Sequence, residues 1–84
     1  GLINRLVPEG RALPAALELA ERIAANGPLA VRASKQIMLK ARDWDWSIAF
    51  EEQRKLSEPV RASEDAREGA LAFTEKRAPR WRGR

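Results

Sequence analysis

The sequence of 84 residues predicts a small all-α domain, with about four helices following a short N-terminal strand. Two observations predict this fold class. Large apolar residues and alanines recur at intervals of three and four along most of the chain, which is the spacing of amphipathic helices. Proline, glycine and asparagine divide the chain into short segments, and these residue types end one helix or begin the next. Residues 1–84 fit within one domain, because single domains usually hold about 50 to 250 residues.

Residues 1–7, GLINRLV, are expected to form the short strand. Ile3 and Val7 are β-branched, and residues 8–10, Pro-Glu-Gly, close the segment as a turn. A single strand finds no partner for its backbone hydrogen bonds within this chain. We therefore expect an edge strand that pairs with polypeptide outside these 84 residues.

The first two helices are expected over residues 13–26 and 28–43. The first has apolar positions at 13, 16, 17, 20, 23 and 24, with Pro14 in the first turn, where its missing N–H is no loss. Asn26-Gly27 indicates a left-handed helix end, and Pro28 stops that helix and opens the next. The second helix carries an apolar stripe of Ala30, Ala33, Ile37, Ala41 and Trp44.

The third helix is expected to begin at Asp45 as N-cap and to end around Pro59. Its apolar positions are Trp46, Ala49, Phe50, Leu56 and Val60, so Trp46, like Trp44, is interpreted as a core residue.

The fourth helix is expected to run from the N-cap Ser63 to Pro79. Its acidic first turn suits the helix dipole, which explains Glu64, Asp65 and Glu68 without a site. The expected buried face is Ala66, Gly69, Ala70 and Phe73, and Gly69 is interpreted as a point of close packing.

Composition excludes several kinds of chemistry. The chain has no cysteine and no histidine, which excludes disulfides, thiolate nucleophiles, Cys/His zinc sites and imidazole-based catalysis. Glu51 and Glu52 are adjacent, so on a helix they point about 100° apart and cannot flank one substrate atom. No glycine-rich phosphate loop is present. We expect no catalytic residue and no metal site in this chain.

The apolar content predicts a soluble chain that needs a partner. The longest apolar run is residues 12–17, far short of the roughly 20 residues that a membrane span requires, so neither a span nor a signal peptide is expected. Of the 37 apolar residues 15 are alanine, which leaves little for a core. We expect a docked partner, an oligomer or a parent domain to complete it. The first residue, Gly1, suggests an excised piece.

The positive charge is concentrated at the C-terminal end. Residues 1–75 hold 11 of the 16 Lys and Arg and all 12 Asp and Glu, whereas residues 76–84 hold five cations and no acid. Such a tail is interpreted as a solvated end, with phosphate contact as the alternative. Trp81 within this tail is suited to an apolar patch on a partner, a membrane or a nucleotide.

One helix face has functional character. Phe73, Lys76 and Arg77 stand at i, i+3 and i+4, which places a flat aromatic ring beside two cations. This suits a purine ring and a phosphate. An ordinary helix ending, with a core phenylalanine followed by cations that match the dipole, explains the same pattern. The spacing alone leaves both interpretations open.

Three segments together resemble the crotonase (enoyl-CoA hydratase/isomerase) family. Residues 1–8, GLINRLVP, are similar to its "GLVNRVVP" segment, and residues 16–31 to its "ALELAxxIAxxxPLAV" helix pair. Residues 63–79 resemble its "SEDxxEGxxAFxEKRxP" ending. The sequence is less typical at residues 13–14 and 43–46, which lie at joints. The resemblance covers nearly the whole chain but only the last third of such an enzyme.

The resemblance implies a C-terminal helical module over residues 1–84 that serves oligomerisation and coenzyme A contact, with the catalytic N-terminal core absent. That core would carry the oxyanion hole and, in hydratases, two glutamates that activate water. The family motif places Phe73 and Lys76 at the adenine and 3′-phosphate end of coenzyme A; Arg77 receives no such role. It also implies a homo-oligomer, trimer or hexamer.

We therefore expect the C-terminal part of a cytoplasmic enoyl-CoA hydratase (a lyase) of fatty acid metabolism. Its partner is an acyl-CoA thioester, and no separate cofactor is expected because coenzyme A is part of the substrate. Neither nucleic acid nor membrane is expected as a partner. The alternatives are another crotonase-family reaction, such as that of an isomerase, or an independent helical module that binds nucleic acid.

Overall fold

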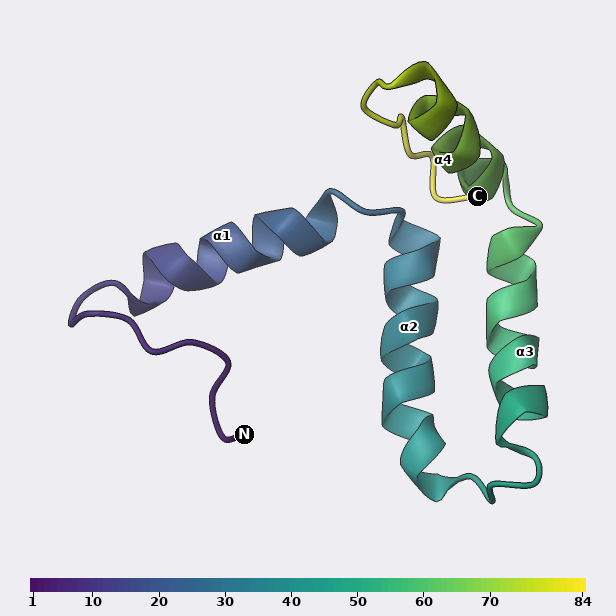
Figure 1. The fold of residues 1–84 in the computed structure, drawn as a ribbon, viewed down its shortest axis with the longest axis horizontal. Coiled ribbons are helices and arrows are strands. Elements are labelled where there is room, and N and C mark those ends of the chain that lie inside the picture. The colour runs from purple at the N-terminus through teal and green to yellow at the C-terminus, as the bar shows by residue number, and fades with distance from the viewer.

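The computed structural model describes residues 1–84 and contains four α-helices, which confirms the all-α fold class. They are α1 (Ala12–Ala24), α2 (Pro28–Lys40), α3 (Ala49–Arg61) and α4 (Glu64–Glu75), and a short 3₁₀ turn, η1 (Ala41–Asp43), continues α2. Helices α2 and α3 form an antiparallel hairpin, α1 projects away from it as an arm, and α4 lies at the end of α3 (Figure 1). No helix is long and apolar enough to cross a membrane.

The predicted N-terminal strand is wrong for this chain. Residues 1–7 have no regular structure, and Leu2 and Leu6 are 98% and 90% exposed. A strand needs a neighbouring strand to complete its backbone hydrogen bonds, and these 84 residues provide none. Pairing of this segment with other polypeptide stays a prediction.

The joint between α1 and α2 is closed by a side chain and not by a left-handed residue. Gly27 has φ −55°, and Asn26 does not adopt a positive φ. The Asn26 amide Nδ2 donates to the carbonyls of Arg22 at 2.8 Å and Ile23 at 3.2 Å. This satisfies carbonyl groups that the last turn of a helix leaves free, so the expected left-handed end is unnecessary.

Helix α3 begins and ends later than predicted. Its first residue is Ala49, because Asp45 caps a turn before the helix by accepting the backbone N–H of Ser47 at 2.9 Å. Pro59 does not stop the helix, which continues to Arg61. A proline this close to the C-terminus removes one hydrogen bond of the last turns.

The start of α4 confirms its predicted N-cap. The Ser63 hydroxyl Oγ accepts the N–H of Ala66 at 3.1 Å and donates to the carbonyl of Val60 at 2.6 Å. The hydroxyl therefore joins the end of α3 to the start of α4, and it satisfies one of the N–H groups that a helix start leaves without a partner.

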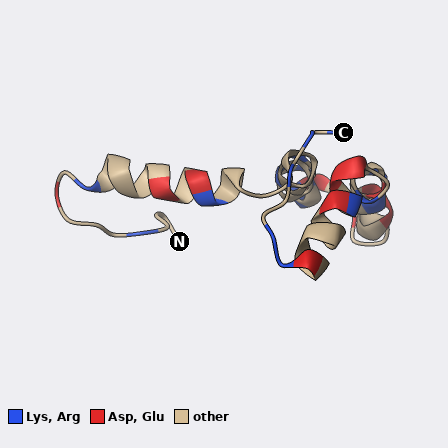
Figure 2. Cartoon of the chain, turned by 90° about the horizontal axis from the view of Figure 1, so that it is seen from above, with Lys and Arg blue, Asp and Glu red and all other residues tan.

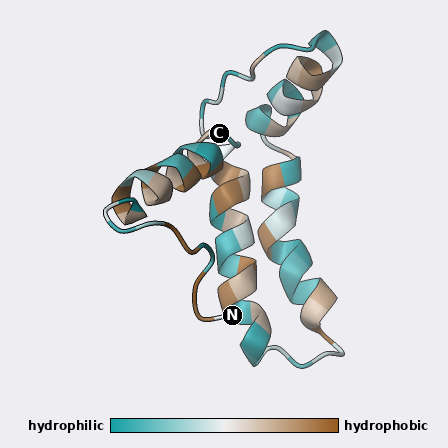
Figure 3. Ribbon diagram, turned by 60° about the vertical axis from the view of Figure 1, so that its left-hand side comes forward, coloured by the Kyte–Doolittle hydropathy of each residue, from teal (hydrophilic) through white to brown (hydrophobic).

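The chain has almost no hydrophobic core of its own. Only Ala72 and Asp65 are buried. The accessible surface is 7509 Å², whereas a compact monomer of this mass exposes about 5000 Å². The radius of gyration is 16.2 Å, against about 12 Å for a compact domain of this length. Hydrophobic stretches of the N-terminal segment, α1 and α2 remain uncovered by the chain (Figure 3).

The expected core role of two aromatic residues is wrong for the same reason. Trp46 is 82% exposed and meets Phe50 edge to face, with ring centroids 6.1 Å apart, and Phe73 of the expected buried face of α4 is 87% exposed. Trp44 is half-buried. The spacing of apolar residues identified the apolar faces of the helices, but the chain has no other element to cover them.

Trp81 makes the main apolar contact of residues 76–84, a segment that we call the C-terminal strap. Its indole lies over Gly69 of α4 and Gly27 before α2, and its Nε1 donates to the Ala25 carbonyl at 2.9 Å. A Cβ at Gly69 would stand 3.2 Å from the ring. Gly69 is therefore a close-packing position, as predicted, but its neighbour is the strap of the same chain.

We predict that Gly69→Leu displaces the Trp81 indole, since the added side chain would occupy the space that the ring fills. In a background with Trp44→Phe and Trp46→Phe, the emission of Trp81 should shift to longer wavelength as the ring enters water. Ala20→Leu, at an exposed position of α1 that does not line the hollow around Trp81, is the control and should leave the emission unchanged. Equal emission spectra for the two variants would contradict the contact between the Trp81 indole and Gly69.

Candidate functional site

Helix α4 ends in a sharp reversal at Lys76. Lys76 has φ 54° and is the one non-glycine residue with a positive φ. The N–H of Lys76 donates to Phe73 at 3.3 Å, and the N–H of Arg77 donates to Ala72 at 3.1 Å. These are the two bonds of a Schellman motif, a helix ending that usually has glycine at the left-handed position. The helix thus ends at Glu75, and the predicted end at Pro79 is wrong.

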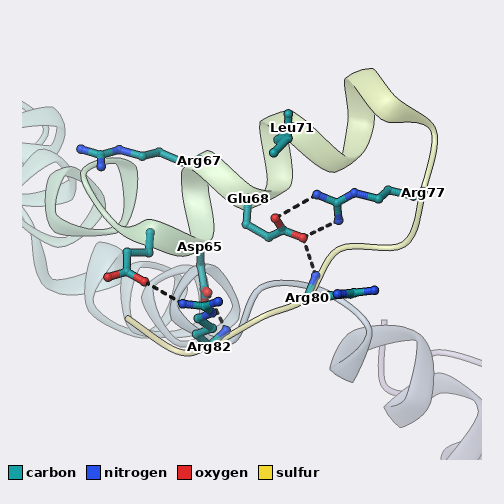
Figure 4. A pocket seen from close by; sticks show the side chains of 8 residues that line it. Asp65, Arg67, Glu68, Leu71, Arg77, Arg80 and Arg82 are labelled. Atoms are coloured by element: carbon teal, nitrogen blue, oxygen red, sulfur yellow. Dashed lines mark hydrogen bonds and ion pairs between the residues drawn. The ribbon is translucent and has the colours of Figure 1, made fainter.

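Glu68 holds the first part of the strap against α4. Its two carboxylate oxygens accept from the Arg77 guanidinium, Nη1 at 2.6 Å and Nη2 at 3.1 Å, and one of them also accepts the Arg80 backbone N–H at 2.7 Å (Figure 4). These donors lower the pKa of Glu68 from 4.5 to about 2, and its carboxylate raises the pKa of Arg77. Arg77 Nε also pairs with Glu75.

Asp65 holds the end of the strap. Its carboxylate accepts the backbone N–H groups of Arg82 at 2.7 Å and Gly83 at 2.9 Å, and its own N–H donates to the Arg84 carbonyl at 3.0 Å. Asp65 is 4% exposed, which makes it the buried charged residue of the chain. Such a carboxylate is tolerated in the interior because backbone donors replace the water that it loses.

The basic tail is solvated, as interpreted, since most of its residues are exposed, but it is not a free end. Asp65 and Glu68 bind its backbone, and Glu64 pairs with Arg84 at 3.1 Å and lies 3.8 Å from Arg82. Figure 2 shows the charged residues along the helices and the strap returning across the molecule. The acids of α4 and the cations of the strap lie within one chain and neutralise each other locally.

The structure places the predicted site residues at the outer corner of this reversal. Phe73 lies near the C-terminal end of α4 and is 87% exposed, and Lys76 follows the helix with its side chain exposed and in no ion pair. Because Lys76 has left the helix, the three residues do not share one helical face. Arg77 is paired with Glu68 and Glu75.

The arrangement offers binding groups and no reacting groups. An exposed aromatic ring can stack on a planar ring, and an unpaired ammonium three residues later can neutralise a phosphate. No group of three or more acidic side chains is placed to hold a metal ion. The pocket between α4 and the strap, of about 530 Å³, is open and lined mainly by the ion pairs described above (Figure 4).

Sequence reasoning missed the roles of Asp65 and Glu68, which it assigned to the helix dipole. The available signal was charge complementarity, since an acidic helix start is followed by a segment with five cations and no acid. Which backbone groups these carboxylates bind depends on the path of the strap, and local spacing does not specify that path.

We predict that the strap loses its hold in acid. The folded pKa of Glu68, about 2, lies below its ordinary value of 4.5, so the stabilisation is complete above pH 4.5 and declines as the pH falls toward 2. Trp81 emission should report this release. The variant Glu68→Gln has no carboxylate at this position, so the change in Trp81 emission between pH 4.5 and pH 2 that Glu68 causes should disappear. The control Glu18→Gln on α1 should retain this change. If Glu68→Gln showed the same acid transition as the unchanged protein, Glu68 would not be the group that holds the strap.

Similar proteins act on coenzyme A thioesters according to their names. Enoyl-CoA hydratase EchA19 of Mycobacterium tuberculosis is 45% identical over the whole chain, which covers 32% of that protein. 2,3-Dehydroadipyl-CoA hydratase of Escherichia coli is 34% identical, again over the whole chain and 33% of the relative. The chain thus spans about a third of the length of the curated relatives that it matches.

Solved structures match the arrangement of the helices closely. An enoyl-CoA hydratase from Mycobacterium tuberculosis superposes with a TM-score of 0.98 at 54% identity, and a probable enoyl-CoA hydratase/isomerase from Mycobacterium abscessus with 0.95 at 55%. Both matches cover the whole chain and 33% of the other protein. The sequence model for enoyl-CoA hydratase/isomerase matches residues 1–84. The chain belongs to the enoyl-CoA hydratase/isomerase family, and its four helices match the all-α C-terminal module of the crotonase fold.

Proposed function

We propose that the complete protein is an enoyl-CoA hydratase that adds water to 2-enoyl-CoA thioesters in fatty acid metabolism. The observation that carries this proposal is the 45% identity, over the entire chain, to a relative named as an enoyl-CoA hydratase. The isomerase alternative within the family stays open, because the family description includes both reactions. Coenzyme A is part of the substrate in this proposal, so no separate cofactor is required.

The role that we propose for residues 1–84 is ligand binding and assembly. The chain has no histidine or cysteine, and the carboxylates of Glu64, Asp65 and Glu68, which line the pocket beside the strap, are already bonded to the strap. We place the oxyanion hole and the two catalytic glutamates in a core outside this chain, as the family resemblance implies. We also propose a cytoplasmic location for the complete protein.

We propose that Phe73 and Lys76 contact the adenine and the 3′-phosphate of coenzyme A. Three features of the structure support this. The Phe73 ring is 87% exposed, the Lys76 ammonium is in no ion pair, and both lie at one corner of α4. The competing cation, Arg77, is neutralised by two glutamates. A phosphate arriving at this corner would therefore find one available cation from these three residues.

The nucleic-acid alternative loses its main support in this structure. It relied on a free basic tail, whereas the acids of α4 bind the strap and pair with Arg77, Arg82 and Arg84. Binding of a polyanion to Arg77, Arg82 or Arg84 would have to break these pairs before these residues gained a phosphate contact.

The hydratase proposal is tested by assaying the complete gene product with crotonyl-CoA. We expect hydration by the complete protein and none by residues 1–84 alone. Lys76→Ala should raise the KM about 10- to 100-fold, because a charge-assisted hydrogen bond contributes about 1.5 to 3 kcal/mol. Phe73→Ala should raise the KM through loss of stacking, which contributes about 1 to 3 kcal/mol per base.

Alanine at position 76 meets the same left-handed backbone cost as lysine, so this change isolates the ammonium. Lys40→Ala, which removes an exposed cation at the end of α2, is the control and should leave the KM unchanged. Isomerisation without hydration would favour the isomerase. An unchanged KM in both site variants would refute the proposed contact, and turnover by the 84 residues alone would refute the division of roles.

We also propose that the complete protein is a homo-oligomer, a trimer or hexamer, whose other polypeptide covers the exposed apolar faces. The chain exposes about 2500 Å² more than a compact monomer of its mass, and Leu13, Leu17 and Met38 are 69%, 54% and 74% exposed. Analytical ultracentrifugation of the complete protein should give a mass of three or six subunits. A monomer at micromolar concentration would contradict this proposal.

A further inference from the structure

The strap sets the position of the corner that carries Phe73 and Lys76. After Lys76 the chain must turn back along α4, because Glu68 and Asp65 hold the following backbone at Arg80, Arg82 and Gly83. The two acids lie one turn apart on a single face of α4, the face on which Ala72 is also buried. Reversal within one residue requires the left-handed conformation that Lys76 adopts, with φ 54° and ψ 41°.

Lys76 adopts this conformation without the residue type that favours it. A left-handed backbone is costly for any residue with a Cβ, and it persists where surrounding contacts impose it. The contacts on its C-terminal side are the bidentate Arg77–Glu68 pair and the Arg80 N–H bond to the same carboxylate. Glu68 therefore holds the chain on both sides of Ala78 and Pro79.

Trp81 connects this corner to the rest of the molecule. Its indole is packed over Gly27 and Gly69 and its Nε1 donates to the Ala25 carbonyl at 2.9 Å. Ala25 and Gly27 belong to the joint between α1 and α2, so the strap joins the end of the chain to that joint. Without it, α4 would be attached to the hairpin mainly through its short connection to α3 (Figure 1).

We propose that Asp65, Glu68 and Trp81 are positioning residues for the coenzyme A contact. They touch no ligand themselves; they hold the strap so that Lys76 stays at a fixed place at the end of α4, three residues after Phe73. This inference rests on the proposed contact of Phe73 and Lys76 and assigns a role to the acidic residues of α4, which that contact does not use.

The test measures dissociation constants of the complete protein for coenzyme A and for 3′-dephospho-coenzyme A by calorimetry. In the unchanged protein the 3′-phosphate should tighten binding on the order of tenfold or more. Glu68→Gln and Asp65→Asn should bring the two constants several-fold closer together, because the ammonium no longer stays at the phosphate. Trp81→Phe keeps a ring over the glycines but loses the Ala25 bond, and should act in the same direction.

Controls separate positioning from loss of the fold. Glu51→Gln breaks an exposed Glu51–Arg54 pair on α3 and should leave the ratio of the two constants unchanged. Weaker binding of both ligands by the same factor, in folded variants, would overturn the inference, because a general structural role does not distinguish the phosphate. An unchanged ratio in Glu68→Gln and Asp65→Asn would also overturn it. If Lys76→Ala itself leaves the ratio unchanged, the proposed contact is wrong, and the inference fails with it.

Discussion

The shortage of buried apolar surface governs this structure. Two buried residues among 84 cannot offset the conformational entropy that ordering the chain costs, since burial is the main favourable contribution to folding. The helices nevertheless have well-marked apolar faces. In the assembly proposed above, other polypeptide covers these faces; the chain matches only about a third of its longer relatives. Within the chain, α2 packs against α3 through half-buried apolar residues, whereas the attachment of the strap depends on polar contacts and on one tryptophan.

Those polar contacts differ in kind from ordinary surface ion pairs. The Glu51–Arg54 pair on α3 joins two flexible exposed side chains, and such pairs contribute about 0 to 1 kcal/mol. Asp65 and Glu68 instead accept N–H groups of the backbone, whose direction is set by the chain path. These bonds therefore fix the course of the strap, which pairing with long side chains alone would not do. The indole over two glycines adds the apolar part of the same attachment.

Local patterns predicted the helices and failed for contacts that involve distant residues. Apolar spacing identified all four helices, and the Ser63 cap follows from a rule that operates within four residues. The strand failed because pairing depends on a neighbour that the chain lacks. The predicted helix end at Pro79 was wrong because lysine gives no signal for the left-handed turn that ends the helix at Glu75. The burial of Asp65 and the place of Trp81 depend on residues 17 and 56 positions away, so no helical period reveals them. The proposed coenzyme A contacts of Phe73 and Lys76 rest on a family motif, and they stay predictions that binding measurements have to test.

If the complete protein is a hydratase, its C-terminal module affects the reaction through binding. A contact made equally with substrate and transition state lowers KM and leaves kcat unchanged. A ligand group far from the reacting bond can still raise the rate when its contact holds the thioester in the reactive position, because correct orientation removes entropy from the barrier. That benefit requires the contact itself to be fixed in space. A lysine on a freely moving chain end would provide attraction without orientation, whereas a lysine held between a helix end and an anchored strap provides both. In this proposal the attachment of the strap to α4 thus gives Asp65 and Glu68 a role that requires neither catalysis nor contact with the ligand.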